Sequence, residues 1–356
     1  MINVTKTYLP SLEKYNKYLN KIFKSSQLTN NGPLVQELEK RLEEYLKVKN
    51  LVLTLNGTLA LQIAYRLLGL KGEVITTPFS FVATTSSLVW ERLKPIFADI
   101  DPETFNINPD LIESRITSET SAILPVHVFG NVCEIDKIQK IADKNKLKVI
   151  YDAAHAFGVK YKNASVFDYG DISMVSFHAT KLFHTIEGGA LIIKDDALYE
   201  RAKRIINFGY EMGDVHELGI NSKMNEFSAA MGLSLLDSID KIIEKRKEVW
   251  QRYCKGLGEG FEVQKKQEGA TRNYHYFPIL LKDEDQVLKI EKALNKEEIN
   301  PRRYFYPSLD TLDYIKPRQK CEISRDIASR ILCLPIYPDL GKREQDKIIK
   351  IVRKYL

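Results

Sequence analysis

The chain has 356 residues and a mass of 41.0 kDa, with 44% hydrophobic and 28% charged residues, so it is too long for one simple core and we expect two domains. No repeat or low-complexity tract is visible, which excludes a disordered, collagen-like or solenoid protein. The 53 basic and 47 acidic residues give a net charge of +6, and residues 251–356 hold the whole excess. Nucleic-acid binders concentrate basic residues more strongly, so this excess indicates solvated helices or a site for a small acidic ligand.

The cysteines and the N-terminus indicate where the protein works. Cys133, Cys254, Cys321 and Cys333 form no CxxC pair and have no histidine at metal-ligand spacing. We therefore expect reduced thiols, no metal site and a cytoplasmic location. The segment MINVTKTYLPSLEKYNKYL lacks the apolar core of a signal peptide, and the longest uncharged stretch, residues 74–90, is rich in Thr, Ser and Pro. The sequence thus predicts no membrane segment.

Residues 1–240 alternate short β-branched runs with segments of helical periodicity. The predicted strands are LVLTL (51–55), EVITT (73–77), KPIFAD (94–99), SAILPVHV (121–128), LKVIYD (147–152), ISMVSF (172–177) and GALIIK (189–194). Helical periodicity separates them, as in VQELEKRLEEYL (35–46), TLALQIAYRLLGL (58–70) and EIDKIQKIADKNK (134–146). This alternation predicts an N-terminal arm and a large α/β domain with a mostly parallel sheet.

Residues 241–356 predict a smaller α+β domain. The segment 237–257 reads as one long charged helix that bridges to it. A strand-like YHYFPILL (274–281), a helix over 285–298, an aromatic loop RRYFYPS (302–308) and a closing helix over 344–356 follow.

Several unusual residues fall at the ends of predicted strands, where ligands of open parallel sheets collect. In NGTLAL (56–61), Gly57 and Thr58 open a helix and offer amide groups and a hydroxyl to an anion. A threonine that merely caps the helix explains this motif equally well.

Asp152 and Lys181 add two more groups at strand ends. Asp152 ends the buried strand LKVIYD and needs a cationic partner, and His155 lies near it in the sequence; a helix cap is the alternative. Lys181 follows a strand and precedes a Gly-Gly turn, so it is a candidate for Schiff-base chemistry, although a lone lysine is usually a surface residue. A phosphate cradle, an acid for a pyridinium nitrogen and a lysine are together what pyridoxal 5′-phosphate needs.

With these residues in place, the chain resembles the sugar aminotransferases of the DegT/DnrJ/StrS family, which are fold-type I pyridoxal-phosphate enzymes. The matching segments are NNGPLVQELEKRLEEYL, NGTLALQIA, EVITTPFSFVAT, KPIFADIDPETFNI, ILPVHVFGNVCEID, VIYDAAHAFGV, GDISMVSFHATK, EGGALI, GINSKMNEFSAAMGL and RRYFYPSL. They follow one another in order over almost the whole chain, so the resemblance concerns both predicted domains.

The resemblance implies roles for individual residues. Lys181 matches the lysine that forms a Schiff base with the cofactor, Asp152 the partner of the pyridine nitrogen, His155 a position beside the ring, and Phe81 the aromatic residue on its other face. The matches to phosphate-binding positions are Gly57, Thr58, Ser176 and, from the neighbouring subunit, Asn221. The last match implies a homodimer with shared active sites.

Departures from the family pattern are few. Ile186 stands where the family commonly has Gly, and Leu59 where it has Ala, and neither change removes a polar contact. Position 181 is lysine, whereas related sugar dehydratases have histidine there. The resemblance therefore favours transamination over deoxygenation.

The segments TNNGP, SFHATKLFHTIEGGA, PRRYFYPSL and ILCLPIYPDL most resemble the subgroup that makes dTDP-4-amino-4,6-dideoxyglucose from dTDP-4-keto-6-deoxyglucose, with L-glutamate as amino donor. Such sugars enter surface glycans such as the O-antigen of lipopolysaccharide. The predicted substrate contacts are Asn30, Asn31, His184, Arg302, Arg303, Tyr304 and Tyr306, and His178 also flanks the lysine. Salt bridges for the arginines and packing for the histidines are the alternatives.

Three other functions stay open. An aminotransferase acting on a dTDP-3-keto-6-deoxyhexose is the closest competitor, because the two reactions differ only in which carbonyl is aminated. A non-transaminating pyridoxal-phosphate enzyme is disfavoured by Lys181. A regulatory protein that senses a sugar is disfavoured because no helix-turn-helix segment accompanies the intact candidate residues.

Overall fold

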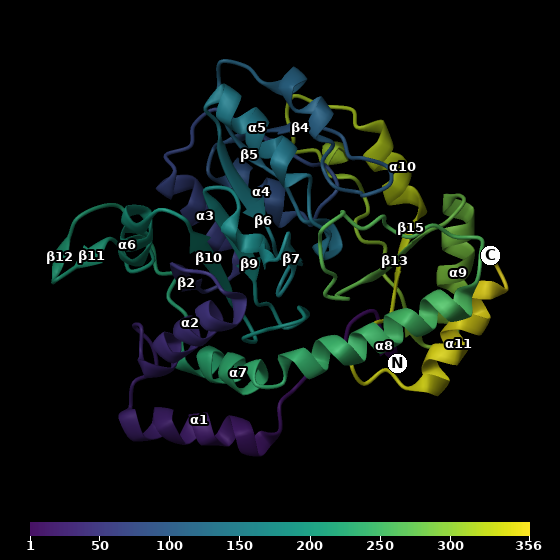
Figure 1. Cartoon of the computed structure of the whole chain (residues 1–356), viewed down its shortest axis with the longest axis horizontal. Coiled ribbons are helices and arrows are strands. Elements are labelled where there is room, and N and C mark those ends of the chain that lie inside the picture. The colour runs from purple at the N-terminus through teal and green to yellow at the C-terminus, as the bar shows by residue number, and fades with distance from the viewer.

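A seven-stranded sheet forms the centre of the larger part of the molecule (Figure 1). The structure is a computed structural model that describes all 356 residues. The strands lie in the order β2 (Leu51–Thr54), β10 (Gly189–Ile193), β9 (Ile172–Ser176), β6 (Lys148–Asp152), β5 (Thr120–Leu124), β3 (Glu73–Thr76) and β4 (Lys94–Phe97). Only β10 runs antiparallel to its neighbours. All seven predicted strands and the mostly parallel α/β fold are confirmed.

Both faces of this sheet are buried, which explains the continuous apolar runs in the sequence. Leu51 and Leu53 of β2 pack into one hydrophobic core, and Val52 between them packs into another. The first core includes helices α2 (Pro33–Leu46), α5 (Ile135–Asn145) and α7 (Glu226–Leu236). The second includes α3 (Gly57–Leu67), α4 (Ala83–Trp90) and α6 (Asp196–Ile205).

The predicted strand over 121–128 is too long. Strand β5 ends at Leu124, and the chain turns into a short 3₁₀ helix over Val128–Gly130. The next residue after the strand is Pro125, which has no amide hydrogen for a ladder, and Phe129 adopts a left-handed φ of 57° that no strand contains. This turn brings Phe129 and Gly130 close to the end of β6.

The long charged helix predicted as a bridge is α8 (Ile239–Leu257), and Figure 1 shows it running from α7 to the smaller part of the molecule. Ile242 packs into the core under the large sheet, whereas Val249 and Tyr253 pack into a separate core. This separate core of the smaller part surrounds an antiparallel pair of strands, β13 (Phe277–Leu280) and β15 (Ile331–Leu334). The helices of this part are α9 (Glu284–Asn295), α10 (Glu322–Arg330) and α11 (Lys342–Arg353).

The N-terminal end lies with the smaller part. Strand β1 (Ile2–Asn3) pairs in parallel with β14 (Ile299–Asn300), and the Ile336 amide donates to the Val4 carbonyl at 3.0 Å. The chain then crosses to the large part and forms α1 (Leu12–Ser25). The first residues therefore bind to the smaller part of the molecule through main-chain hydrogen bonds.

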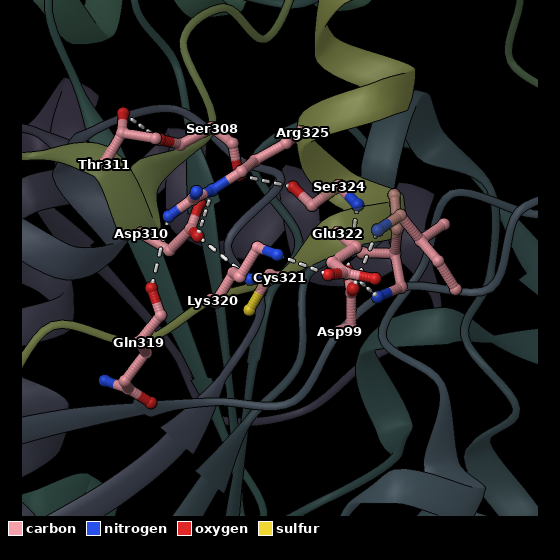
Figure 2. Close-up of polar contacts among 12 residues, drawn as sticks. Asp99, Ser308, Asp310, Thr311, Gln319, Lys320, Cys321, Glu322, Ser324 and Arg325 are labelled. Atoms are coloured by element: carbon pink, nitrogen blue, oxygen red, sulfur yellow. Dashed lines mark hydrogen bonds and ion pairs between the residues drawn. The ribbon is translucent and has the colours of Figure 1, made fainter.

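A polar network fixes the smaller part to an edge of the large sheet (Figure 2). The Gln319 side chain accepts from the Phe97 amide on β4 at 2.7 Å and donates to another β4 carbonyl at 3.0 Å. Asp99 accepts from the amide groups of Ile323 and Ser324, each at 2.9 Å, at the start of α10. A carboxylate that follows β4 of the large sheet thus caps a helix of the smaller part.

The remaining strands form two short hairpins, β7 (Lys160–Tyr161) with β8 (Ala164–Ser165) and β11 (Tyr210–Glu211) with β12 (Asp214–Val215). The second hairpin projects from the body of the molecule beside α6 (Figure 1). None of the helices combines the length and the apolar character that crossing a membrane requires.

Candidate active site

A cavity of about 420 Å³ opens where strands β2, β6 and β9 end. Eight of the predicted site residues line it, namely Gly57, Thr58, Phe81, Asp152, His155, Ser176, Lys181 and Tyr304. A larger cavity of about 810 Å³ between α3, α4 and α6 contains none of them. The chemistry of the lining, rather than volume, therefore identifies the smaller cavity as the candidate active site.

Asp152 is a buried carboxylate at the end of β6. Burial raises its pKa, and three opposing influences favour the ionised form: a hydrogen bond from the Thr84 hydroxyl at 2.8 Å, one from the Ala154 amide at 3.2 Å, and the nearby Lys181 charge. No helix begins at Asp152, so the helix-cap alternative is wrong. Its environment is that of a carboxylate held ready for a cationic ligand group.

Lys181 follows β9 in a loop and is partly buried. Desolvation lowers its pKa to about 8, and the attraction of Asp152 opposes this shift only in part. An amine in this state is more easily deprotonated than a surface lysine, whose pKa is near 10.4. The surface-lysine alternative is therefore wrong, and Lys181 has the character of a nucleophilic amine.

His155 is buried, and its ring lines the cavity. Burial lowers its pKa well below the usual range, and the positive charge of Lys181 adds to this effect. Nδ1 accepts from the Phe129 amide at 3.3 Å, so the neutral ring carries its hydrogen on Nε2. His155 is thus not the cation that Asp152 needs, and Lys181 is the charged group that acts on the carboxylate.

The start of α3 forms the anion-binding end of the cavity. Asn56, not Thr58, caps this helix by accepting from the Leu59 amide at 2.9 Å. The Thr58 hydroxyl is therefore free of the capping role, and the first amide groups, those of Gly57 and Thr58, have no acceptor within the helix. Ser176 lies beside them at the end of β9. Together they suit a phosphate.

A second cavity of about 390 Å³ adjoins the first one, and Phe81 and Tyr304 line both. Arg302 and Tyr306 are exposed along it. Arg303 is different, because Nη2 donates to Glu284 at 2.6 Å and to the Ser329 carbonyl at 3.0 Å. The salt-bridge alternative is therefore correct for Arg303, whereas Arg302 faces solvent without an ion pair.

The structure assigns His184 to packing. Its ring is buried outside the cavity, with Nε2 at 2.8 Å from the Tyr8 carbonyl and Nδ1 accepting from the Ile186 amide at 3.2 Å. Both nitrogens are thus used within the protein, and the predicted substrate contact of His184 is wrong for this cavity. His178 does line the cavity, where Nε2 lies 3.5 Å from Glu187.

Like His184, the predicted residues Asn30, Asn31 and Asn221 lie outside both cavities of their own chain. Asn30 and Asn31 occupy the exposed turn before α2, both with left-handed φ, and Asn221 is exposed ahead of α7.

Sequence reasoning missed Thr84 and Ser80. Both are buried, their hydroxyl groups lie 2.7 Å apart, and Thr84 donates onward to Asp152. They belong to ITTPFSFVATT, where polar residues without periodicity stand in an otherwise uncharged stretch. Buried hydroxyl groups of this kind need partners, which is the signal that could have found them.

The fold and the site define an aminotransferase of the α/β class. The solved structure of DesI, obtained in the presence of its TDP-sugar product, superposes with a TM-score of 0.94 at 32% identity and covers 99% of this chain and 92% of the other. A model of the DegT/DnrJ/EryC1/StrS aminotransferase family matches residues 11–353, and the chain belongs to this family.

Two relatives narrow the comparison. The chain is 44% identical to a dTDP-4-amino-4,6-dideoxy-D-glucose transaminase of Shigella dysenteriae, with 99% of this chain and 98% of the relative covered. It is 41% identical to the Escherichia coli protein of the same name, with the same coverage.

Proposed function

We propose that this protein transfers the amino group of L-glutamate to dTDP-4-keto-6-deoxyglucose and forms dTDP-4-amino-4,6-dideoxyglucose, with pyridoxal 5′-phosphate as cofactor. The observation that carries the proposal is the pairing of Lys181, whose pKa burial lowers to about 8, with the buried carboxylate of Asp152 in one cavity. The two transaminases that share 41–44% identity with this chain support the choice of sugar.

The cavity fits pyridoxal phosphate at both ends. Amide groups at the start of α3, with Thr58 and Ser176, would hold the phosphate, and Asp152 would hold the ring nitrogen. Phe81 and His155 line the space between them and would lie against the ring. When bound, the cofactor supplies an electron sink that stabilises negative charge on the substrate carbon.

The protein's own groups handle protons and orientation. Lys181 Nζ can take a proton from the substrate carbon and return it, because its lowered pKa makes the free amine accessible near neutral pH. The ionised carboxylate of Asp152 would favour a protonated ring nitrogen when the cofactor is bound, and the Thr84 hydroxyl stabilises that ionised form.

The adjoining cavity provides a place for the nucleotide diphosphate. Arg302 is exposed there without an ion pair and offers a cation to the diphosphate, while Tyr304 stands between the two cavities. Arg303 would act only indirectly, by holding the Tyr306 ring, because its guanidinium carbon lies 3.6 Å from the centroid of that ring.

The experiment that tests this function uses purified protein, L-glutamate and, separately, the dTDP-3-keto and dTDP-4-keto 6-deoxyhexoses. NMR should locate a new amine at C4, and the Lys181→Ala variant should form no product. Amination at C3 alone would support the 3-aminotransferase instead. Wild-type activity in the Lys181→Ala variant would overturn the role of this lysine.

We also propose a homodimer with shared active sites, in which Asn30, Asn31 and Asn221 reach the partner's cavity. A mixture of Lys181→Ala and Asn221→Ala subunits tests it, because only a mixed dimer regains one intact site. Random exchange should restore about a quarter of wild-type activity. A mixture as inactive as its components would contradict the shared site.

A further inference from the structure

Asn273 is a buried amide just outside the cavity that the proposed mechanism does not use. Its Nδ2 donates to the main-chain carbonyls of His155 at 2.8 Å and Phe157 at 3.0 Å, and its Oδ1 accepts from the His275 amide at 3.2 Å. More than a hundred residues separate it from both carbonyls. One side chain from the segment before β13 thus holds two carbonyl groups of the loop that follows β6.

This loop carries the ring of His155. Nδ1 of that ring is held by the Phe129 amide, and its carbonyl is held by Asn273, so the ring is fixed at both its side chain and its main chain. Gly130 follows Phe129 with a φ of 81°, and a Cβ there would lie 2.7 Å from the His155 carbonyl oxygen. The space around this carbonyl therefore admits only a glycine and a correctly placed donor.

Asn273 is itself anchored in the smaller part of the molecule. Arg246 of α8 donates from Nη1 to the His275 carbonyl at 3.1 Å and to the Ile336 carbonyl at 2.9 Å. Tyr276, three residues after Asn273, lines the cavity, and its ring centroid lies 4.9 Å from that of His155. The segment 273–276 therefore connects the second domain to the wall of the site.

We infer that Asn273 is a positioning residue, which sets the place of the His155 ring against the cofactor and makes that place depend on the second domain. The inference rests on the proposed function, because it presumes that the ring at His155 faces pyridoxal phosphate. The group acts through His155 and does not itself touch the reacting atoms. Its loss should weaken cofactor binding and slow turnover more than it affects folding.

Asn273→Asp tests this inference, because it keeps the shape but replaces a donor to two carbonyls with a group that repels them. Asn131→Asp is the matched control. Asn131 is also buried and also joins the two parts, donating to the Thr104 and Lys265 carbonyls at 3.3 and 2.9 Å, but it does not line the cavity. Both variants should lower the unfolding temperature of the apoprotein to a similar extent.

The decisive measurement is the Kd for pyridoxal phosphate, obtained by absorbance or fluorescence titration of the apoprotein. We expect Asn273→Asp to raise it at least tenfold and to lower kcat at a largely unchanged KM for the sugar nucleotide, Asn273→Ala to do so less, and Asn131→Asp to stay within twofold of wild type. Equal effects in both Asp variants, or wild-type binding in Asn273→Asp, would overturn the inference.

Two further outcomes are informative. If both Asn273 variants fail to fold while Asn131→Asp folds, Asn273 serves the fold rather than the site and the inference is wrong. If wild-type protein binds no pyridoxal phosphate, the proposed function fails and the inference fails with it. If wild-type protein binds the cofactor and Asn273→Asp binds it equally well, only the inference fails.

Discussion

Thr84→Val removes one buried hydroxyl group from the lining of the site. Thr84 lies in α4, and its Oγ1 is 2.8 Å from Asp152 Oδ2 and 2.7 Å from Ser80 Oγ. Because the carboxylate can only accept, Thr84 donates to Asp152 and accepts from Ser80. Valine has nearly the same shape, so the substitution removes this chain of hydrogen bonds with little change in packing.

The size of the effect follows from the nature of this bond. A hydrogen bond to a charged group contributes about 1.5–3 kcal/mol, and 1.36 kcal/mol corresponds to one pH unit in a titration. The bond favours the ionised form of Asp152, so its loss raises the pKa of a carboxyl that burial has already raised. The ionised form is then lost at higher pH, and the acidic limb of the pH profile of kcat/KM should move up by about 1–2 pH units.

The assay compares pH profiles of transamination and of cofactor binding for the two proteins. Thr85→Val is the control, since Thr85 is also buried in α4 but donates to the carbonyl of Val82, the N-cap of the same helix, at 3.2 Å. The control profile should match that of wild type. An unchanged acidic limb in Thr84→Val, or an equal shift in Thr85→Val, would refute the role of this hydroxyl.

Three other predictions concern charge and stability. Arg302→Ala should raise the KM for the sugar nucleotide at least about tenfold without changing the unfolding temperature, whereas Arg303→Ala, which breaks the ion pair with Glu284, should lower that temperature; the reverse pattern would contradict the assignment. Asp99→Ala should destabilise the protein by about 1–2 kcal/mol in urea titrations because the cap of α10 is lost, and no change would rule this cap out. Burial raises the pKa of Glu39 from 4.5 to about 7. The folded protein therefore keeps this proton to a higher pH than the unfolded chain does, and the free energy of unfolding falls as the pH rises from 4.5 to 7. Glu39→Gln should remove this slope and add on the order of 2 kcal/mol at pH 8, and a persisting slope would exclude Glu39 as its source.

Burial on both faces made the central sheet predictable. Each strand contains a run of at least two apolar residues, and the segments between strands are polar or contain Gly and Pro. Helix α4 escaped prediction because ATTSSLVW has no helical period, and it is a helix because buried hydroxyl groups such as those of Thr84 and Ser87 find partners in the fold. A buried helix whose apolar residues do not recur at the helical period cannot be predicted from the sequence pattern alone.

Some residues of the candidate site could be placed from the sequence, and others could not. Lys181 and Asp152 stand next to strand ends and match family positions, so their placement in one cavity was predictable. Arg303 and His184 also lie in matching segments, yet their partners are set by tertiary structure, since the Tyr8 carbonyl is 176 residues from His184. Asn273 shows the same limit, because nothing local reveals which carbonyls a buried amide will meet.

Glu226 joins the turn before α2 to the start of α7. This buried carboxylate in α7 accepts from the Leu34 and Val35 amides, both at 2.9 Å, and so caps α2, whose own cap position is Gly32. A Cβ on Gly32 would lie 2.5 Å from Glu226, so only glycine permits this approach. The Glu226 amide also donates to the Leu28 carbonyl at 2.9 Å, which fixes the turn with Asn30 and Asn31 beside the segment that holds Asn221. The turn with Asn30 and Asn31 is therefore tied to the start of α7, five residues after Asn221, and the proposed shared site would draw on both segments.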